Sequence, residues 1–320
     1  MILVCGEALI DLFVAGTANG ASLPATAAAG GSPFNLAVGL ARLGAPSAYL
    51  GGLSRDGFGA FLAGRLAAEG VDTRLAKRSP KPTPLVVVSP DPAGHPSYTF
   101  HAHDCAERDL AVEDLPPALG PEVEAIALGS YVLGLEPIGG ALLALAEREG
   151  PRRVVSLDPN LRPSLIGDLD AWRARFDRLV RTAAVVKLSE EDVQAAYGAG
   201  ADPAEWAGRW LAAGASLVVL TRGPAGATAF HASGRFRAPR LPVTVADTVG
   251  AGDAFHAALL ARLHQRRLLR RKALAALDPA ALQDALRYAS VAAGLTCERR
   301  GADLPREAEV RAALGRHGAG

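Results

Sequence analysis

Short apolar runs alternate with amphipathic helical stretches along most of the chain, and this alternation limits the folds that the chain can adopt. The runs have the length of buried strands, and the stretches between them repeat apolar residues at helical spacing. The pattern predicts strands over 1–5, 125–128, 153–157, 183–188 and 216–220, and helices over 34–43, 58–66, 138–149, 190–197 and 203–213. Elements in this order form a mostly parallel sheet that helices cover on both faces, an α/β fold in three layers.

Two regions interrupt the alternation and indicate a small inserted β-sheet. Residues 15–29 are rich in Ala, Thr and Gly and show no period, whereas residues 84–103 alternate apolar and polar side chains around a Pro- and Gly-containing turn at 90–94. The second pattern is typical of a β-hairpin. We expect a lid built from about 12–30 and 84–106, inserted into one domain that spans 1–320.

Composition excludes several classes of partner. The chain has 320 residues, is 49% hydrophobic and carries a net charge of +1, so no global field attracts nucleic acid or an anionic membrane. Its three cysteines, Cys5, Cys105 and Cys297, are far apart and odd in number, which argues against a disulfide framework. The start of the chain lacks the basic segment of a signal peptide, and no apolar run is long enough to span a bilayer. We therefore expect a cytoplasmic protein.

The segment 247–255, DTVGAGDAF, concentrates the chemistry of the chain. The alternating residues 243–245 before it and the apolar run after it predict a strand, a glycine turn and a helix. The amides of Gly250, Ala251 and Gly252 then converge at a helix N-terminus, which binds phosphate. Asp253 in the same turn could be a general base for a hydroxyl that attacks this phosphate, or an ordinary helix cap. The segment alone fits both interpretations equally well.

Other loops follow predicted strands and carry groups suited to a polyol. Asp11 follows the first strand, at the sheet edge where open α/β sheets place ligands. Gly30 and Gly31 allow close approach of a ligand to the backbone, and Asn35 offers both a donor and an acceptor. Arg162 lies in the loop after the strand 153–157. Each residue also has a plain structural interpretation, as a turn, a hinge, a cap or a salt bridge.

The turn 221–226, TRGPAG, follows the strand 216–220, and its small residues leave room for a ring or a phosphate. The chain contains neither the G-x-x-x-x-G-K-[ST] loop nor a G-x-G-x-x-G after its first strand. Taken together, the loops predict a polyol site and a phosphate site along one edge of the sheet, without a P-loop.

These motifs are similar to those of the ribokinase-like (PfkB) carbohydrate kinases. The resemblance rests on GGSPFN at 30–35 and DTVGAGD at 247–253, with landmarks at 51–59, 70–72 and 221–223 between them, and it covers nearly the whole chain. It implies a Rossmann-like α/β domain of three αβα layers with a β-sheet lid. It also implies ATP-dependent phosphorylation of a sugar hydroxyl.

The resemblance assigns roles residue by residue. Asp253 would be the base, and the amides of Gly250, Ala251 and Gly252 would hold the charge of the transferring phosphoryl group. The sugar would contact Asp11, Gly30, Gly31, Asn35 and Arg162. The nucleotide would contact Lys187, Ser189, Thr221, Gly223, Gly226, Gly250 and Gly252.

Metal ions enter through the same resemblance. Family members commonly use Mg²⁺, and many bind K⁺ near the segment that matches Asp247 and Val249. The family's Asn-x-x-Glu element, tied to Mg²⁺, matches Ser189 to Asp192 here, with Ser for Asn and Asp for Glu. The carboxylate that acts indirectly on Mg²⁺ is therefore either Glu191 or Asp192.

Within the family the chain is most similar to fructokinases, through 158–162, 187–191 and 295–302. This similarity implies conversion of fructose to fructose 6-phosphate. The alternatives are 2-keto-3-deoxygluconate kinase or another sugar or nucleoside kinase of the family. Sugar-acid kinases usually place a Tyr/Arg pair on the lid, whereas the lid segment here, 98–103, reads YTFHAH without Arg, which favours a neutral sugar. Because family lids often dimerise, we expect a homodimer.

Overall fold

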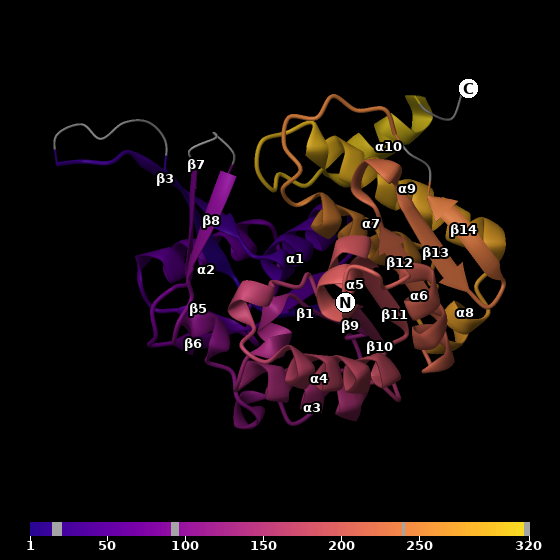
Figure 1. Ribbon diagram of the computed structural model, residues 1–320, viewed down its shortest axis with the longest axis horizontal. Helices are drawn as coiled ribbons and strands as arrows, with labels where there is room; N and C mark the ends of the chain where they lie inside the picture. The colour runs from indigo at the N-terminus through magenta and orange to yellow at the C-terminus, as the bar shows by residue number, and fades with distance from the viewer. Residues whose placement is uncertain (15–20, 91–95, 239–240, 317–320) are drawn as a thin grey trace.

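The computed structural model describes residues 1–14, 21–90, 96–238 and 241–316, and its centre is one large sheet (Figure 1). In spatial order its strands are β14 (Gly234–Ala238), β13 (Ala227–His231), β12 (Leu217–Thr221), β11 (Val185–Ser189), β10 (Val154–Asp158), β9 (Ala125–Gly129), β1 (Ile2–Cys5) and β4 (Ser47–Leu50). The strands from β12 to β4 run parallel, whereas β13 pairs antiparallel with β12 and β14 pairs antiparallel with β13. The predicted, mostly parallel sheet is confirmed.

Helices cover both faces of this sheet, so that its strands are buried on both sides. One apolar core lies under α1 (Ser32–Arg42), α2 (Gly57–Ala68), α7 (Ala251–Gln265), α8 (Arg271–Ala275), α9 (Pro279–Cys297) and α10 (Glu307–Arg316). The other lies under α3 (Ile138–Glu149), α4 (Leu169–Thr182), α5 (Glu190–Tyr197) and α6 (Pro203–Ala212). In β1, Ile2 and Val4 face the first core while Leu3 and Cys5 face the second, which explains the unbroken apolar run. The three-layer fold class is confirmed.

A second, four-stranded sheet projects from one end of the molecule (Figure 1). Its order is β3 (Ala25–Gly30), β2 (Leu9–Val14), β7 (Leu85–Pro90) and β8 (Pro96–His101). The antiparallel pairing of β7 with β8 confirms the predicted hairpin, although most of its expected turn lies outside the described residues. This sheet begins at Leu9, three residues before the expected lid boundary.

Short elements complete the fold. A two-stranded sheet pairs β5 (Gly52–Ser54) with β6 (Lys77–Ser79). Single 3₁₀ turns occur at Ala106–Arg108, Val112–Asp114, Tyr131–Gly134, Pro163–Leu165 and Gly223–Ala225. Among the described residues, no helix combines the length and the apolarity needed to cross a membrane.

The strand predicted over 243–245 is wrong. These residues form no strand, and Val245 is 60% exposed. The chain here is attached to the end of α9 instead, because the amides of Ala246 and Asp247 both donate to the carbonyl of Cys297. An alternating pattern without a neighbouring strand edge cannot form a ladder, so the segment runs as an extended connection into α7.

Candidate active site

Asp253 lies at the N-terminus of α7, at the carboxyl edge of the large sheet. Gly250 caps this helix with a left-handed φ of 78°, a conformation that glycine adopts without strain. Asp253 is buried, with 8% of its surface exposed, whereas Gly252 beside it is exposed. The first turn of a helix leaves amides without intrahelical partners, so this end of α7 can bind an anion beside a buried carboxylate.

Two side chains of α1 hold the carboxylate of Asp253. The hydroxyl of Ser32 donates to Oδ1 at 2.6 Å, and Nδ2 of Asn35 donates to Oδ2 at 2.8 Å. Gly31 leads into α1 with a φ of 102°, and a Cβ there would lie 2.9 Å from the carbonyl oxygen of Glu7. The glycine therefore lets the chain turn tightly enough to bring the start of α1 against the start of α7.

Burial raises the pKa of Asp253 to about 6. Hydrogen bonds from Ser32 and Asn35 act in the opposite direction, as does the charge of Lys187, while the charge of Asp158 raises the pKa further. A carboxylate with a pKa near 6 is ionised at neutral pH and is still basic enough to accept a proton from a reacting hydroxyl. This is the tuning that general bases require.

Lys187 lies within β11, where it forms a buried ion pair with Asp158 at the end of β10. Its Nζ is 2.7 Å from Oδ2 of Asp158, and both side chains are almost fully buried. Burial alone would lower the pKa of Lys187, but the charge and hydrogen bond of Asp158, together with the charges of Asp253 and Asp192, outweigh burial and raise this pKa. A Cβ at Gly252 would lie 3.3 Å from the same Nζ. The ammonium group therefore lies next to the anion site of α7.

His256 supports this ion pair from α7. Its Nε2 is 2.7 Å from Oγ of Ser156, and its Nδ1 is 3.7 Å from Oδ2 of Asp158. Burial lowers the pKa of His256 to about 3, helped by the charge of Lys187, so the ring is neutral. Oδ1 of Asp158 is buried and has no hydrogen-bond partner among the described residues.

The sugar-side residues predicted from the sequence largely come together. Asp11 lies on β2, paired with β3, and a Cβ at Gly30 would lie 2.2 Å from its Oδ2. Burial raises the pKa of Asp11 to about 6, and the charge of Asp253 contributes to the shift. Arg162 is exposed, and its Nη1 donates to the carbonyl oxygens of Asn160 and Leu161 rather than to another side chain.

The nucleotide-side residues end neighbouring strands. Ser189 of β11 is in register with Thr221 of β12, so the two lie side by side. Gly223 and Gly226 follow in a turn that is largely open to solvent. These residues share the carboxyl edge of the sheet with Asp253, as the loop pattern predicted.

The carboxylates considered for metal binding differ in their surroundings. Asp192 is buried in a capping box, in which Oδ2 accepts from the amide and the hydroxyl of Ser189, and its Oδ1 accepts from the amide of Leu161. Glu191 on the same turn is exposed. The described parts of the chain contain no group of three His, Cys, Asp or Glu that could hold a metal. Mg²⁺ that arrives with ATP takes one or two carboxylates plus phosphates, so these residues fit an indirect role.

Asp247 ties the segment before α7 to the C-terminal part of the chain. Its Oδ1 accepts from the amide of Val249 at 3.1 Å, and its Oδ2 accepts from the amide of Gly301 at 2.8 Å. These two bonds hold the loop that precedes Gly250 in a defined conformation.

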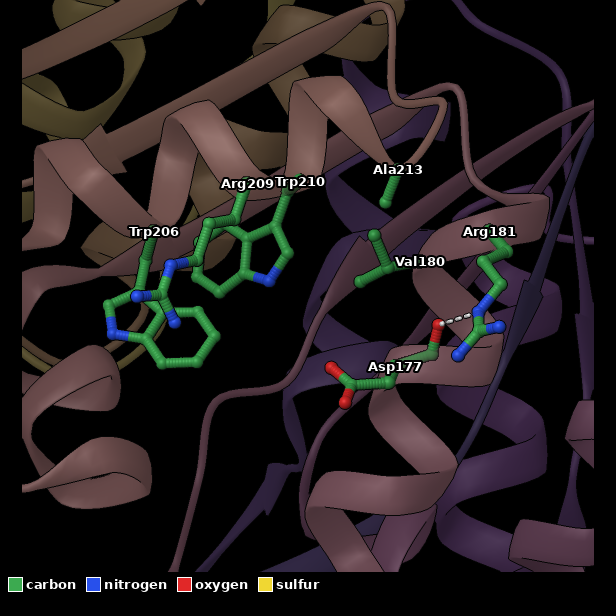
Figure 2. Close-up of a pocket in the computed structure, with 7 residues that line it drawn as sticks. All are labelled: Asp177, Val180, Arg181, Trp206, Arg209, Trp210 and Ala213. Atoms are coloured by element: carbon green, nitrogen blue, oxygen red, sulfur yellow. Dashed lines mark hydrogen bonds between the residues drawn. The ribbon is translucent and has the colours of Figure 1, made fainter.

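A hollow of about 310 Å³ lies elsewhere, between α4 and α6 (Figure 2). Trp206, Trp210 and Val180 line it, and Arg209 lies over the ring of Trp206 at 4.5 Å from its centroid. None of the residues predicted for the sugar, nucleotide or metal sites lines this hollow.

Sequence reasoning did not assign a role to Ser32, Asp158 or His256. Ser32 and Asp158 stood inside quoted motifs, but a serine or an aspartate has too many ordinary uses for its type to reveal a role. The available signal was charge, because Lys187 lies within a mostly apolar strand and Asp158 ends another. Buried charges are paired, so the two could have been matched.

Fold and site together define a phosphotransferase for small molecules that does not use a P-loop. The profile of the pfkB family carbohydrate kinases matches residues 1–309, and the chain belongs to this family. It is therefore an enzyme, a carbohydrate kinase, as the motifs implied.

Relatives and solved structures agree with this assignment. The chain is 39% identical to a fructokinase of Rhizobium leguminosarum bv. trifolii over 89% of this chain and 86% of the relative. A fructokinase of Xylella fastidiosa with bound ATP superposes with a TM-score of 0.91 at 27% identity, covering 99% of this chain and 98% of the other. A double mutant of a Vibrio cholerae O395 fructokinase, bound to fructose, ADP and a potassium ion, superposes with a TM-score of 0.83 at 28% identity over 97% of each chain.

Proposed function

We propose that this enzyme is an ATP-dependent fructokinase that converts fructose to fructose 6-phosphate. The observation that carries the proposal is the buried carboxylate of Asp253 at the N-terminus of α7, directly after the exposed Gly252. A base and an anion site at one point are what in-line phosphoryl transfer to a hydroxyl needs. Similarity to fructokinases over most of the chain supports fructose as the acceptor.

In the proposed reaction, the sugar's hydroxyl oxygen forms a bond to the γ-phosphorus while the bond from this phosphorus to the β–γ bridging oxygen breaks. Asp253 accepts the hydroxyl proton, and ADP leaves. The amides of Gly250, Ala251 and Gly252, together with Lys187, stabilise the charge on the transferring group. Catalysis of this kind depends mainly on positioning and electrostatics.

Substrate contacts follow from the arrangement of the site. Asp11, Gly30, Gly31 and Asn35 would bind the sugar, with Arg162 at the edge of the site. Thr221, Gly223 and Gly226 would contact the nucleotide, with Ser189 beside them. The four-stranded sheet would act as a lid over the sugar, inserted into a single domain.

Mg²⁺ would accompany ATP and neutralise phosphate charge, with Glu191 or Asp192 acting on it through water. Potassium is the proposed monovalent ion at Asp247 and Val249, because a fructokinase that superposes on this chain was solved with a potassium ion. We further propose a cytoplasmic homodimer that forms through the lid. Leu23 and Tyr98 on this sheet and its connection are 56% and 52% exposed.

One observation keeps a sugar-acid kinase as the second candidate. Burial and the charges of Asp247 and Asp11 raise the pKa of Tyr98. The charge of Arg162 only partly opposes this rise, and it shows that this tyrosine and this arginine lie within electrostatic reach of one another. A Tyr/Arg pair from two different segments could bind a carboxylate, although the lid segment itself has no arginine.

A coupled assay of ADP release tests the proposal and its alternatives. Fructose, ribose, 2-keto-3-deoxygluconate and a nucleoside are offered separately with MgATP. We expect the highest kcat/KM with fructose. A preference for 2-keto-3-deoxygluconate would transfer the assignment to the second candidate, and no ADP release with any acceptor would refute the kinase mechanism.

A further inference from the structure

Both carboxylate oxygens of Asp253 accept hydrogen bonds from side chains of the protein itself. Ser32 binds Oδ1 and Asn35 binds Oδ2, at 2.6 and 2.8 Å. Ser32 is the first residue of α1 and Asn35 lies three positions later, so both side chains project from one face of this helix. A sugar hydroxyl that is to be deprotonated must therefore share or replace one of these two donors.

We propose that Ser32 is a positioning residue, whose hydroxyl holds Oδ1 of Asp253 until the sugar hydroxyl donates there, while Asn35 keeps Oδ2 in place. This inference rests on the proposed role of Asp253 as the base. The two donors differ chemically. A serine hydroxyl can rotate away and can itself accept a hydrogen bond, whereas the amide nitrogen of Asn35 can only donate. Ser32 is thus the donor that the sugar hydroxyl can replace at Oδ1 of Asp253.

The main chain places Ser32 more firmly than its short side chain suggests. Its amide donates to Oε1 of Glu7 at 3.2 Å, and Glu7 is 1% exposed. The tight turn at Gly31 packs against the main chain of Glu7 as well. With its backbone held from both directions, the hydroxyl needs only one torsion to reach Asp253.

Charged groups face Asp253 from every element around it. Asp158 and Lys187 approach from β10 and β11. Glu7 follows β1 and Asp11 lies within β2; burial raises the pKa of both, and the charge of Asp253 adds to each shift. Among these groups only Lys187 is positively charged. The hydrogen bonds from Ser32 and Asn35 therefore make an important contribution to lowering the pKa of Asp253. Loss of the Ser32 hydroxyl moves the pKa of Asp253 upward.

The test is the pH profile of kcat/KM for wild type, Ser32→Ala and Ser32→Thr, measured with the best acceptor of the assay above. Ser32→Ala should shift the acid limb upward by about one pH unit, so that kcat/KM falls about fivefold more at pH 6 than at pH 8. Ser32→Thr, which restores a hydroxyl, should return the limb toward wild type. If Ser32→Ala does not fold, Ser32→Cys, a weaker donor of similar size, takes its place.

Ser47→Ala is the matched control, because Ser47 also bonds to α1, through the carbonyl of Ala37 at 2.9 Å, but lies away from the base. It should lower the melting temperature without moving the acid limb. An unmoved limb in Ser32→Ala, or a threonine variant that behaves like the alanine variant, overturns the proposal. Asp253→Asn distinguishes failure of the base assignment from failure of the role proposed for Ser32. If it stays active, the base assignment fails, and if it is inactive while the limb of Ser32→Ala is unmoved, the role of Ser32 alone fails.

Discussion

The proposed base, Asp253, and the proposed nucleotide turn, 221–226, lie on the same edge of one sheet, but they are built differently. Asp253 is buried and held by side chains of another helix, whereas Gly223 and Gly226 lie in a turn that is largely open to solvent. The base region is arranged before any substrate arrives. The nucleotide region offers exposed main chain that a bound phosphate or ring would order.

This difference predicts that the Asp253 region affects the chemical step and that the turn 221–226 affects nucleotide binding. A preorganised base lowers the barrier of the chemical step, because no protein group has to move when the proton is transferred. An open turn lets the nucleotide enter and leave. Substitutions near Asp253 should therefore change kcat, and substitutions in the turn should mainly change the KM for ATP.

The sharpest test of the comparison is Asp253→Asn. Removing the base should lower kcat by about 10²–10⁴-fold, while the Kd for the sugar changes little. Steady-state kinetics and calorimetric titration with sugar measure the two quantities. Near-wild-type turnover would show that the buried carboxylate is only a helix cap.

Gly252→Val tests the anion site at the start of α7. Its side chain would fill the space in front of the amides, next to Nζ of Lys187. We expect kcat to fall by about 10²–10³-fold, the cost of losing a preorganised oxyanion site. Gly64→Val is a suitable control, because a Cβ at this exposed helical glycine of α2 meets no atom within 4 Å. Unchanged phosphoryl transfer in Gly252→Val would refute the anion site.

The pH dependence of the wild-type enzyme measures how strongly the base is tuned. Because burial raises the pKa of Asp253 to about 6, the carboxylate takes up a proton below this pH and loses its function. We expect kcat/KM for the sugar to fall about tenfold for each pH unit below about 6. An acid limb that begins only near pH 4, the range of an ordinary aspartate, would contradict the preorganised base.

His256→Gln tests the buried histidine that contacts Ser156 and Asp158. The pKa of His256 is lowered to about 3 in the folded protein, so an unfolded chain takes up a proton near pH 6.5 that the folded one refuses. Stability is therefore lost as pH falls from about 6.5 toward 3, by up to about 1.4 kcal/mol per pH unit from this group. Urea unfolding between pH 7 and 5 should show a shallower pH dependence in His256→Gln than in wild type. Equal slopes would mean that His256 is not buried as a neutral ring.

Much of the fold was predictable because both faces of the sheet are covered. Continuous apolar runs such as 1–5 and 125–128 admit few other interpretations, and the helix over 138–149 was predicted with its observed bounds. The glycine-rich motifs also predicted two turns that the structure brings together, at the starts of α1 and α7. Gly250 and Gly31 have positive φ angles that other residues rarely adopt. A glycine at such a position therefore indicates a tight turn from the sequence alone.

Other features were not predictable from local pattern. Residues 243–245 alternate like a strand, but no strand pairs with them among the described residues. Ser32 and Asp253 are 221 positions apart, and their contact depends on how α1 packs against α7. The same holds for Ser156 and His256, which meet across 100 positions.

The sequence by itself determined the class of fold, the order of its elements and the type of chemistry, because apolar periodicity and glycine motifs act through local backbone geometry. Only the tertiary structure decided which oxygen of Asp253 meets which donor, which carboxylate pairs with Lys187 and which acidic groups are already occupied. These are consequences of burial, because the charge and basicity of a side chain depend on the neighbours that folding brings to it. Glu191 and Asp192 show the difference, since they are adjacent in the chain and yet one is exposed while the other is bonded on both oxygens inside the protein.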